Sequence, residues 1–231
     1  DRIRVLLVDG EASGDPLTSY GYVFQALLDP DPNVLPTFAV EVADLVALLG
    51  GQLAPQDHDV IVLADVERLN TRATEQLLLA LRAGRGVLFA FGERSERDSF
   101  NLHLHAAGDG PMPFRLLETR GSAAKSGTAR TAVITAPEHP LLAEFDEPVY
   151  REILQAIPVW RWHAVAGPLG EGTSVVLALT DAEQSPLLVT RPFGEGKAVF
   201  LTSPLASEYR PERWNHLDNP LVAFPLLHGL V

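Results

Sequence analysis

Apolar residues along roughly the first 95 positions form short continuous runs, and most runs are followed by a segment in which apolar residues recur every three or four positions. Short apolar runs are typical of strands buried on both faces of a parallel sheet, whereas the longer period is typical of amphipathic helices. We expect strands at 3–8, 38–42, 60–64 and 87–91, and helices at 18–28, 43–49 and 71–83. This alternation predicts an α/β fold with a mostly parallel sheet and right-handed crossovers.

The pattern changes in the second half of the chain. Residues 108–126 are rich in glycine, proline and serine, and short apolar or alternating runs follow at 131–135, 159–165, 174–179 and 187–191. We interpret about 108–188 as a β-rich insertion or elaboration of a single domain that spans 1–231. A glycine-containing turn then leads into the apolar strand 197–202, which we expect to return to the central sheet. A helix over 219–230 closes the chain.

The charge balance restricts the partners that the chain can have. It carries 18 basic and 30 acidic residues, a formal net charge of −12. Binding to a nucleic acid needs a basic face, so we expect no nucleic-acid partner. No apolar run approaches the ~20 residues of a membrane span, so attachment to a membrane would require segments outside this chain. Because the sequence starts at Asp1 without methionine, we interpret it as excised from a longer protein.

The chain contains no cysteine, which excludes disulfides, thiolate metal sites and a cysteine nucleophile. The absence is most informative at Gly92-Glu93-Arg94-Ser95, the turn that follows the expected strand 87–91. In a doubly wound sheet, ligands and reacting groups gather at the carboxyl ends of the strands. A turn at this position without a thiol therefore argues against thiol chemistry.

The order of the motifs resembles the class I glutamine amidotransferase-like domains, and in particular the ThuA-like branch and the C-terminal domains of BatA-like membrane-anchored bacterial proteins. The segments LRAGRGVLFAFGER and LLVTRPFGEGKAVFLTS carry most of the resemblance, together with VLLVDGE near the start. The match spans nearly the whole chain. It implies a flavodoxin-like three-layer core.

The chain departs from this family at the two places where its enzymes carry their chemistry. The resemblance implies a cysteine on the turn after strand 87–91 and a histidine and glutamate beyond the final strand. Here Gly92 is followed by Glu93 and Arg94, and the final strand continues into Thr202-Ser203-Pro204. Glutaminase chemistry needs an activated nucleophile and a base within reach of it, so we exclude glutaminase activity.

Acidic residues follow the expected strand ends and suggest a crevice for a ligand. Together with Glu93, an acidic crevice could hold a divalent cation or a cationic ligand. Alternatively these carboxylates cap the following helices, which suits Asp44 and Asp65 well. Arg94 could pair with Asp65 or Glu93, as an ion pair that holds the fold would, and Trp214 could act as a lid or a packing anchor. The acidic residues are Asp9, Glu11, Asp15, Asp44 and Asp65, and the candidate crevice comprises Asp9, Glu11, Asp65, Glu93, Arg94, Ser203 and Trp214.

Three further groups have both a functional and a structural interpretation. Ser95 could act as a nucleophile with His103 or His105 as its base, and the two histidines would share a face on a strand and could then bind a metal. We favour a solvated surface segment for all three. Trp160 and Trp162 share one face of an alternating strand and could bind a sugar ring or a partner, but we favour a place in the core.

These observations favour a non-catalytic interaction or ligand-sensing domain with no cofactor and no metal. The resemblance to BatA-like proteins implies a membrane-anchored bacterial protein that faces the periplasm. Two alternatives remain open. One is a ThuA-like hydrolase or sugar-metabolism enzyme that uses a polar crevice, and the other is an acidic cation-binding domain.

Overall fold

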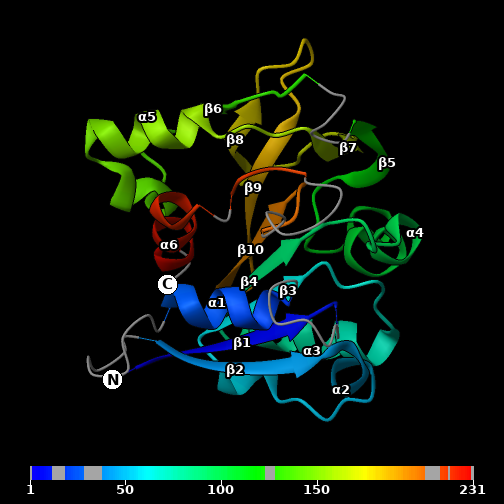
Figure 1. Cartoon of the computed structure of the whole chain (residues 1–231). Coiled ribbons are helices and arrows are strands. Elements are labelled where there is room, and N and C mark those ends of the chain that lie inside the picture. The colour runs from blue at the N-terminus through cyan, green and yellow to red at the C-terminus, as the bar shows by residue number, and fades with distance from the viewer. Residues whose placement is uncertain are drawn as a thin grey trace.

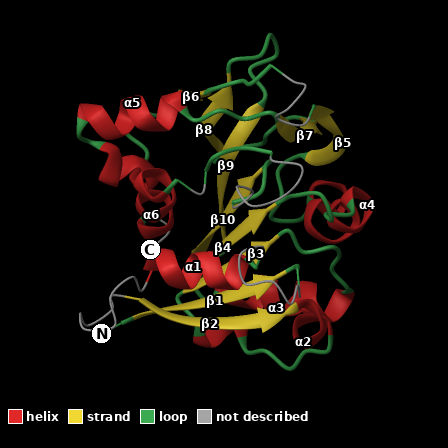
Figure 2. Cartoon of the chain, in the orientation of Figure 1, coloured by secondary structure: helices red, strands yellow, loops and turns green. Residues whose placement is uncertain are grey.

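An eight-stranded, mostly parallel sheet forms the centre of the protein, with helices on both faces (Figures 1 and 2). The computed structural model describes residues 2–11, 19–28, 38–122, 128–205, 214–217 and 219–229. The strand order is β2-β1-β3-β4-β10-β9-β8-β6. The predicted α/β class with a mostly parallel sheet is therefore confirmed.

The sheet has a parallel half and an antiparallel half. The parallel strands are β1 (Ile3–Asp9), β2 (Phe38–Asp44), β3 (Val60–Ala64), β4 (Gly86–Ala90) and β10 (Gly196–Leu201). The antiparallel continuation consists of β9 (Pro186–Phe193), β8 (Ser174–Leu179) and β6 (Ala132–Ile134). Because β10 pairs with β4 on one side and β9 on the other, it joins the two halves. The expectation that the last strand returns to the central sheet is confirmed.

The two faces of the sheet are covered by different helices (Figure 1). One apolar cluster contains side chains from α1 (Tyr20–Leu28), α5 (Pro148–Ala156) and α6 (Pro220–His228). The other contains side chains from α2 (Leu45–Leu49), α3 (Thr71–Arg82) and α4 (Arg97–Phe100). Along β1, Val5 and Leu7 belong to the first cluster and Leu6 and Val8 to the second, as alternation on a strand requires. No helix in the described ranges is long and apolar enough to cross a membrane.

The segment after β4 is helical, and the sequence pattern had not indicated this. The helix α4 continues into a π-helical turn, Asn101–His105, and a 3₁₀ turn, Ala106–Gly108. Phe100 and Leu104 are buried in the core, so they hold this segment against the protein. The helix α5 was also not predicted. Two further 3₁₀ turns lie at Pro55–Asp57 and Pro140–Phe145.

A second, two-stranded sheet stands beyond the carboxyl end of β4 (Figure 1). It pairs β5 (Arg115–Gly121) with β7 (Arg161–Ala166), and its register is interrupted by an irregularity between Leu116 and Thr119. The antiparallel strand predicted at 159–165 corresponds to β7. This small sheet brings residues from the middle of the chain next to the turn after β4.

Candidate functional site

The turn after β4 is fixed to the end of β3 through Asp65. Oδ1 of Asp65 accepts hydrogen bonds from the backbone N–H of Arg94, at 3.0 Å, and from Oγ of Ser95, at 3.4 Å. Ser95 Oγ also accepts one from the backbone N–H of Gly92, at 3.0 Å. Asp65 is fully buried and has a φ of 48°, in the left-handed region that Asp tolerates better than most residues. Both side chains therefore hold the turn in shape.

Two glycines allow the backbone to approach Asp65 closely. A Cβ atom on Gly10 would lie 2.0 Å from the carbonyl oxygen of Asp65, and one on Gly92 would lie 2.5 Å from its carboxyl carbon. Real Cβ atoms do not approach other atoms this closely, so neither position can accept a side chain without movement of the turn. Asp65 does not cap a helix, contrary to one of our interpretations, because Asn70 caps α3 instead.

The carboxylate of Asp9 organises the start of α1. It accepts hydrogen bonds from the backbone N–H of Glu11 at 2.9 Å, from Ser19 Oγ at 2.8 Å and from the backbone N–H of Gly21 at 3.0 Å. With these contacts and 6% exposure, Asp9 acts as a structural carboxylate. Asp44 caps α2 through the backbone N–H of Ala47, as one interpretation expected. Asp15 lies outside the described residues.

Arg94 pairs with a different acid from the two that we expected. Its guanidinium donates to the carbonyl oxygen of Gly10 at 3.0 Å and to Glu11 Oε1 at 3.3 Å. The expected ion pair with Asp65 or Glu93 is therefore wrong. The reason is that only the backbone N–H of Arg94 faces Asp65, while its side chain crosses to the end of β1.

Glu93 is held by two residues from distant parts of the chain. Its Oε2 accepts hydrogen bonds from Arg161 Nη1 at 2.8 Å and from Trp214 Nε1 at 3.1 Å. The Arg161 guanidinium lies 4.6 Å from the centre of the Trp214 ring, a cation–π distance. Trp214 is only 2% exposed. Of its two expected roles, the structure supports the packing anchor.

Ser203 lies under this network and is completely buried. Its Oγ donates to the carbonyl oxygen of Arg161 at 3.0 Å and accepts from Asn215 Nδ2 at 2.6 Å. Asn215 Nδ2 also donates to the carbonyl oxygen of Pro204, at 2.8 Å. Within the proposed crevice set, Asp9, Asp65 and Ser203 are thus buried in internal hydrogen bonds, whereas Glu93 borders an open cavity.

His163, on β7, is a site residue that the sequence analysis did not identify. Its Nε2 faces the carbonyl oxygen of Gly92 at 2.9 Å, so this nitrogen carries the hydrogen. Its ring packs against Phe91 and Trp214. The signal lay in the alternation of 159–165, because Arg161 and His163 share the face opposite Trp162. Of the two tryptophans expected in the core, Trp162 belongs to it, whereas Trp160 is only partly buried and packs against the ring of His216.

Burial lowers the pKa of His163 below its usual value of 6.5, and the Arg161 guanidinium acts in the same direction. Contacts with the carbonyls of Gly92 and Leu117 and the charge of Glu93 oppose this effect without outweighing it. The ring is therefore neutral at pH 7, and its Nδ1 is an acceptor. Nδ1 is buried and has no hydrogen-bond partner among the described residues.

This titration predicts a loss of stability in mild acid. Below pH 6.5 the unfolded His163 binds a proton more readily than the folded one, so the free energy of unfolding falls as the pH drops from about 7 to about 5. His139, whose pKa is also lowered by burial and by Lys197, contributes in the same direction. Urea unfolding at a series of pH values should show a smaller fall for His163→Gln than for the unmodified chain. Equal falls in the two proteins would contradict this assignment, and above about pH 7 the two profiles should run parallel.

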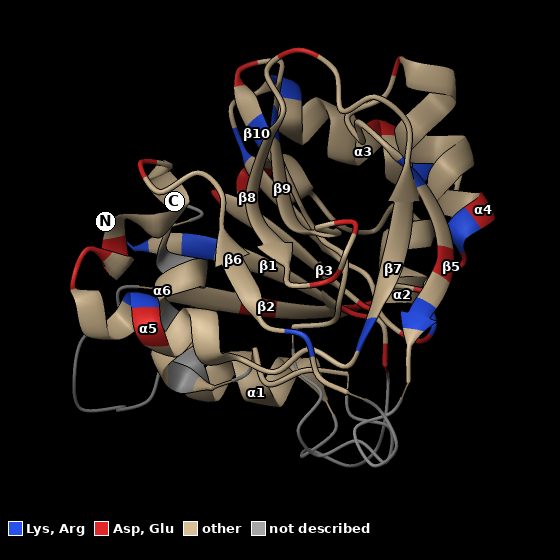
Figure 3. Cartoon of the chain, turned by 90° about the horizontal axis from the view of Figure 1, so that it is seen from above, with Lys and Arg blue, Asp and Glu red and all other residues tan. Residues whose placement is uncertain are grey.

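An open cavity of about 630 Å³ lies between the turn after β4, α4 and β5. Its wall includes Glu93, Ser95, Glu96, Asp98, Glu118 and His163. Figure 3 shows that α4 and β5, which lie side by side, both carry acidic and basic positions. Arg97 also lines the cavity, and its Nε lies 3.7 Å from Oδ1 of Asp98. Carboxylates therefore predominate in the wall of this cavity.

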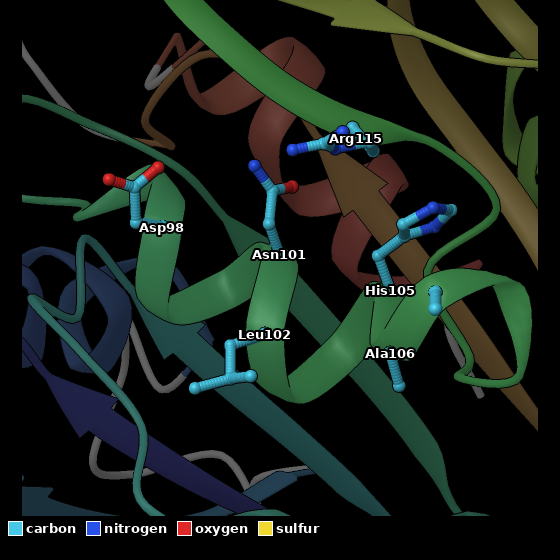
Figure 4. A pocket seen from close by; sticks show the side chains of 7 residues that line it. Asp98, Asn101, Leu102, His105, Ala106 and Arg115 are labelled. Carbon is cyan, nitrogen blue, oxygen red and sulfur yellow. The ribbon is translucent and has the colours of Figure 1, made fainter.

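A second cavity, of about 600 Å³, shares Asp98 with the first (Figure 4). Asn101 is fixed there by two hydrogen bonds to the backbone of Leu116, and His105 Nδ1 faces the carbonyl oxygen of Met112 at 3.2 Å. His103 and His105 lie on a helical turn, so they do not share a face as the metal hypothesis assumed. The described part of the chain contains no group of three metal-ligating side chains.

No family model and no curated protein matches this sequence. Solved structures do match its fold. A cytoplasmic protein from Salmonella typhimurium LT2 has a TM-score of 0.61 and 16% identity, over 99% of this chain and 99% of its own. A second cytoplasmic protein from Salmonella typhimurium has a TM-score of 0.62 and 14% identity, over 98% of each chain. A ThuA-like protein from Bacteroides uniformis has a TM-score of 0.64 and 10% identity, over 100% of this chain and 91% of its own.

These similarities show that the chain has a fold also found in ThuA-like proteins, which agrees with the ThuA-like part of the resemblance. The BatA-like part stays a prediction. The extracytoplasmic location that it implied is wrong, because two solved structures that match nearly the whole chain are of cytoplasmic proteins.

Proposed function

We propose that this chain is a non-catalytic ligand-binding domain with a ThuA-like fold, and that its ligand occupies the cavity beside the turn after β4. The main support is that some polar groups at the sheet edge are buried in internal hydrogen bonds, whereas others line the open cavity. Asp9, Asp65 and Ser203 are buried and hydrogen-bonded within the protein, whereas several carboxylates and the buried ring of His163 line the cavity. A concave site with a few converging polar groups is a suitable place for a small ligand.

The geometry around Ser95 argues against the hydrolase alternative. A serine nucleophile needs a base that takes its proton. Ser95 Oγ instead lies 3.4 Å from both Asp65 Oδ1 and the carbonyl oxygen of Val66, while His163 directs its Nε2 hydrogen at the carbonyl of Gly92. Each group is thus committed to shaping the turn. The turn also lacks backbone strain, because neither Glu93 nor Ser95 has a positive φ.

The proposal includes the finer fold assignment, a flavodoxin-like core of the amidotransferase-like type. The parallel strands follow the order β2-β1-β3-β4-β10, which matches the 2-1-3-4-5 order of flavodoxin-like sheets. Glu93 then stands on the turn where the related enzymes keep their nucleophile, and its carboxylate is bound by Arg161 and Trp214. A binding role for this turn is consistent with that arrangement.

Binding without turnover is the expected result of a direct test. The purified chain is screened against a panel of small metabolites by thermal shift, and each compound that raises the melting temperature is then incubated with the protein and followed by NMR. We expect binders to be recovered unchanged. Turnover that is abolished in both Ser95→Ala and His163→Gln, but retained in a surface variant such as Glu75→Gln, would establish an enzyme and contradict the proposal.

A further inference from the structure

We infer that the cavity beside the turn after β4 takes a small organic cation rich in N–H donors, such as a primary diamine. This inference rests on the proposed function and specifies the chemistry of its ligand. It follows from three properties of the cavity wall: the charge that faces the cavity, the state of His163 and the size of the space.

Carboxylates outnumber basic groups in the wall, and two of them have no partner among the described residues. Among the described residues, the side-chain carboxylates of Glu96 and Glu118 have no hydrogen-bond or ion-pair partner. Both line the cavity, Glu96 at the start of α4 and Glu118 on β5. Glu93 uses only Oε2 in its contacts with Arg161 and Trp214, which leaves Oε1 as an acceptor. A cation placed between these carboxylates would interact favourably with all of them.

His163 adds an acceptor that the protein itself does not satisfy. The side chain lines the cavity although the residue is only 6% exposed. Because Nε2 donates to the carbonyl of Gly92, the neutral ring has its lone pair on Nδ1, and none of the described residues donates to it. A buried polar atom without a partner is costly, and a ligand N–H or a water held by the ligand would satisfy it. Because acceptors outnumber donors in this wall, the cavity favours a ligand that donates hydrogen bonds.

The dimensions favour an organic cation over a metal ion. The cavity has a volume of about 630 Å³, which is in the range of small-molecule sites. Among the described residues, no three carboxylates or histidines come close enough together to hold a metal. The net charge of −12 also attracts cations of any kind toward the protein, so the selectivity must come from the N–H donors of the ligand.

Isothermal titration calorimetry with putrescine, a primary diamine, tests the inference against two matched probes. The neutral analogue 1,4-butanediol has the same carbon chain with hydroxyl groups, and Mg²⁺ tests for binding of any cation. We expect putrescine alone to bind, with an affinity that falls as salt is added. The double variant Glu96→Gln/Glu118→Gln should lose about tenfold or more in affinity. Glu75→Gln removes an exposed, unpaired carboxylate on α3 and should leave the affinity unchanged.

The outcomes separate this inference from the proposed function. Equal binding of 1,4-butanediol or Mg²⁺, or an unchanged affinity in the double variant, would overturn the inference. If putrescine fails to bind while another compound of the metabolite panel binds, the inference is wrong and the proposed function stands. If no compound of either kind binds, both are wrong.

Discussion

Replacement of Trp214 by alanine is expected to lower the free energy of unfolding by about 3–5 kcal/mol, as for other large buried aromatic residues. Trp214 is among the largest buried side chains of the protein, and its loss would leave a cavity that its neighbours cannot fill. It would also remove a hydrogen bond to Glu93 and the ring beneath the Arg161 guanidinium. Chemical denaturation of the two proteins measures the difference directly.

A matched variant separates packing from hydrogen bonding. Trp214→Phe keeps an aromatic ring and loses the Nε1 donor, so its cost should be closer to about 1–2 kcal/mol. If Trp214→Ala instead costs less than about 1 kcal/mol, the side chain would be a mobile cover of the crevice and not the packing anchor that the structure shows.

Alanine at Gly10 is expected to cost about 3 kcal/mol or more, or to prevent folding. The new Cβ would lie 2.0 Å from the carbonyl oxygen of Asp65 and 2.7 Å from that of Ala64. Both are backbone atoms at the end of a central strand, so a side-chain rotation cannot relieve the clash. Gly92→Ala should also be strongly destabilising, because its Cβ would lie 2.5 Å from the fixed carboxyl group of Asp65.

Gly50→Ala provides the control for these two variants. Gly50 ends α2 with a φ of −73°, and the nearest atom to its Cβ would be the carbonyl oxygen of Val46 at 3.1 Å. Its effect should stay within about 1 kcal/mol. Thermal unfolding of all three variants tests the comparison. Similar melting temperatures would show that the backbone at the end of β3 can shift to accommodate the new side chains at little cost in stability.

The central sheet was predictable because its strands carry a strong local signal. The runs 60–64 and 87–91 differ from β3 and β4 by at most one residue at either end. The segment 97–108 was harder to assign. There an apolar residue, Leu102, lies exposed between the buried positions Phe100 and Leu104, and the segment is helical because those two buried side chains pack against the core. Such packing is a tertiary effect that local periodicity does not show.

The sequence analysis placed the candidate site at the carboxyl ends of the strands, but it did not predict the contacts of the individual side chains. The rule that functional groups lie at the carboxyl ends of strands selected Glu93, and the structure places Glu93 at the border of the cavity. The same rule could not distinguish it from Asp9 and Asp65, since their roles depend on backbone N–H groups in other segments. His163 was missed because its partner, the carbonyl of Gly92, lies 71 residues away.

These long separations also have a consequence for folding. The contacts that assemble the site join residues 68, 71 and 121 positions apart in the sequence. Closing such long loops costs entropy that only a preformed sheet can offset. We therefore expect the site to form late, after the transition state for folding. Substitutions at Arg161 or Trp214 should then accelerate unfolding more than they slow folding, and a bound ligand should prolong the lifetime of the folded state.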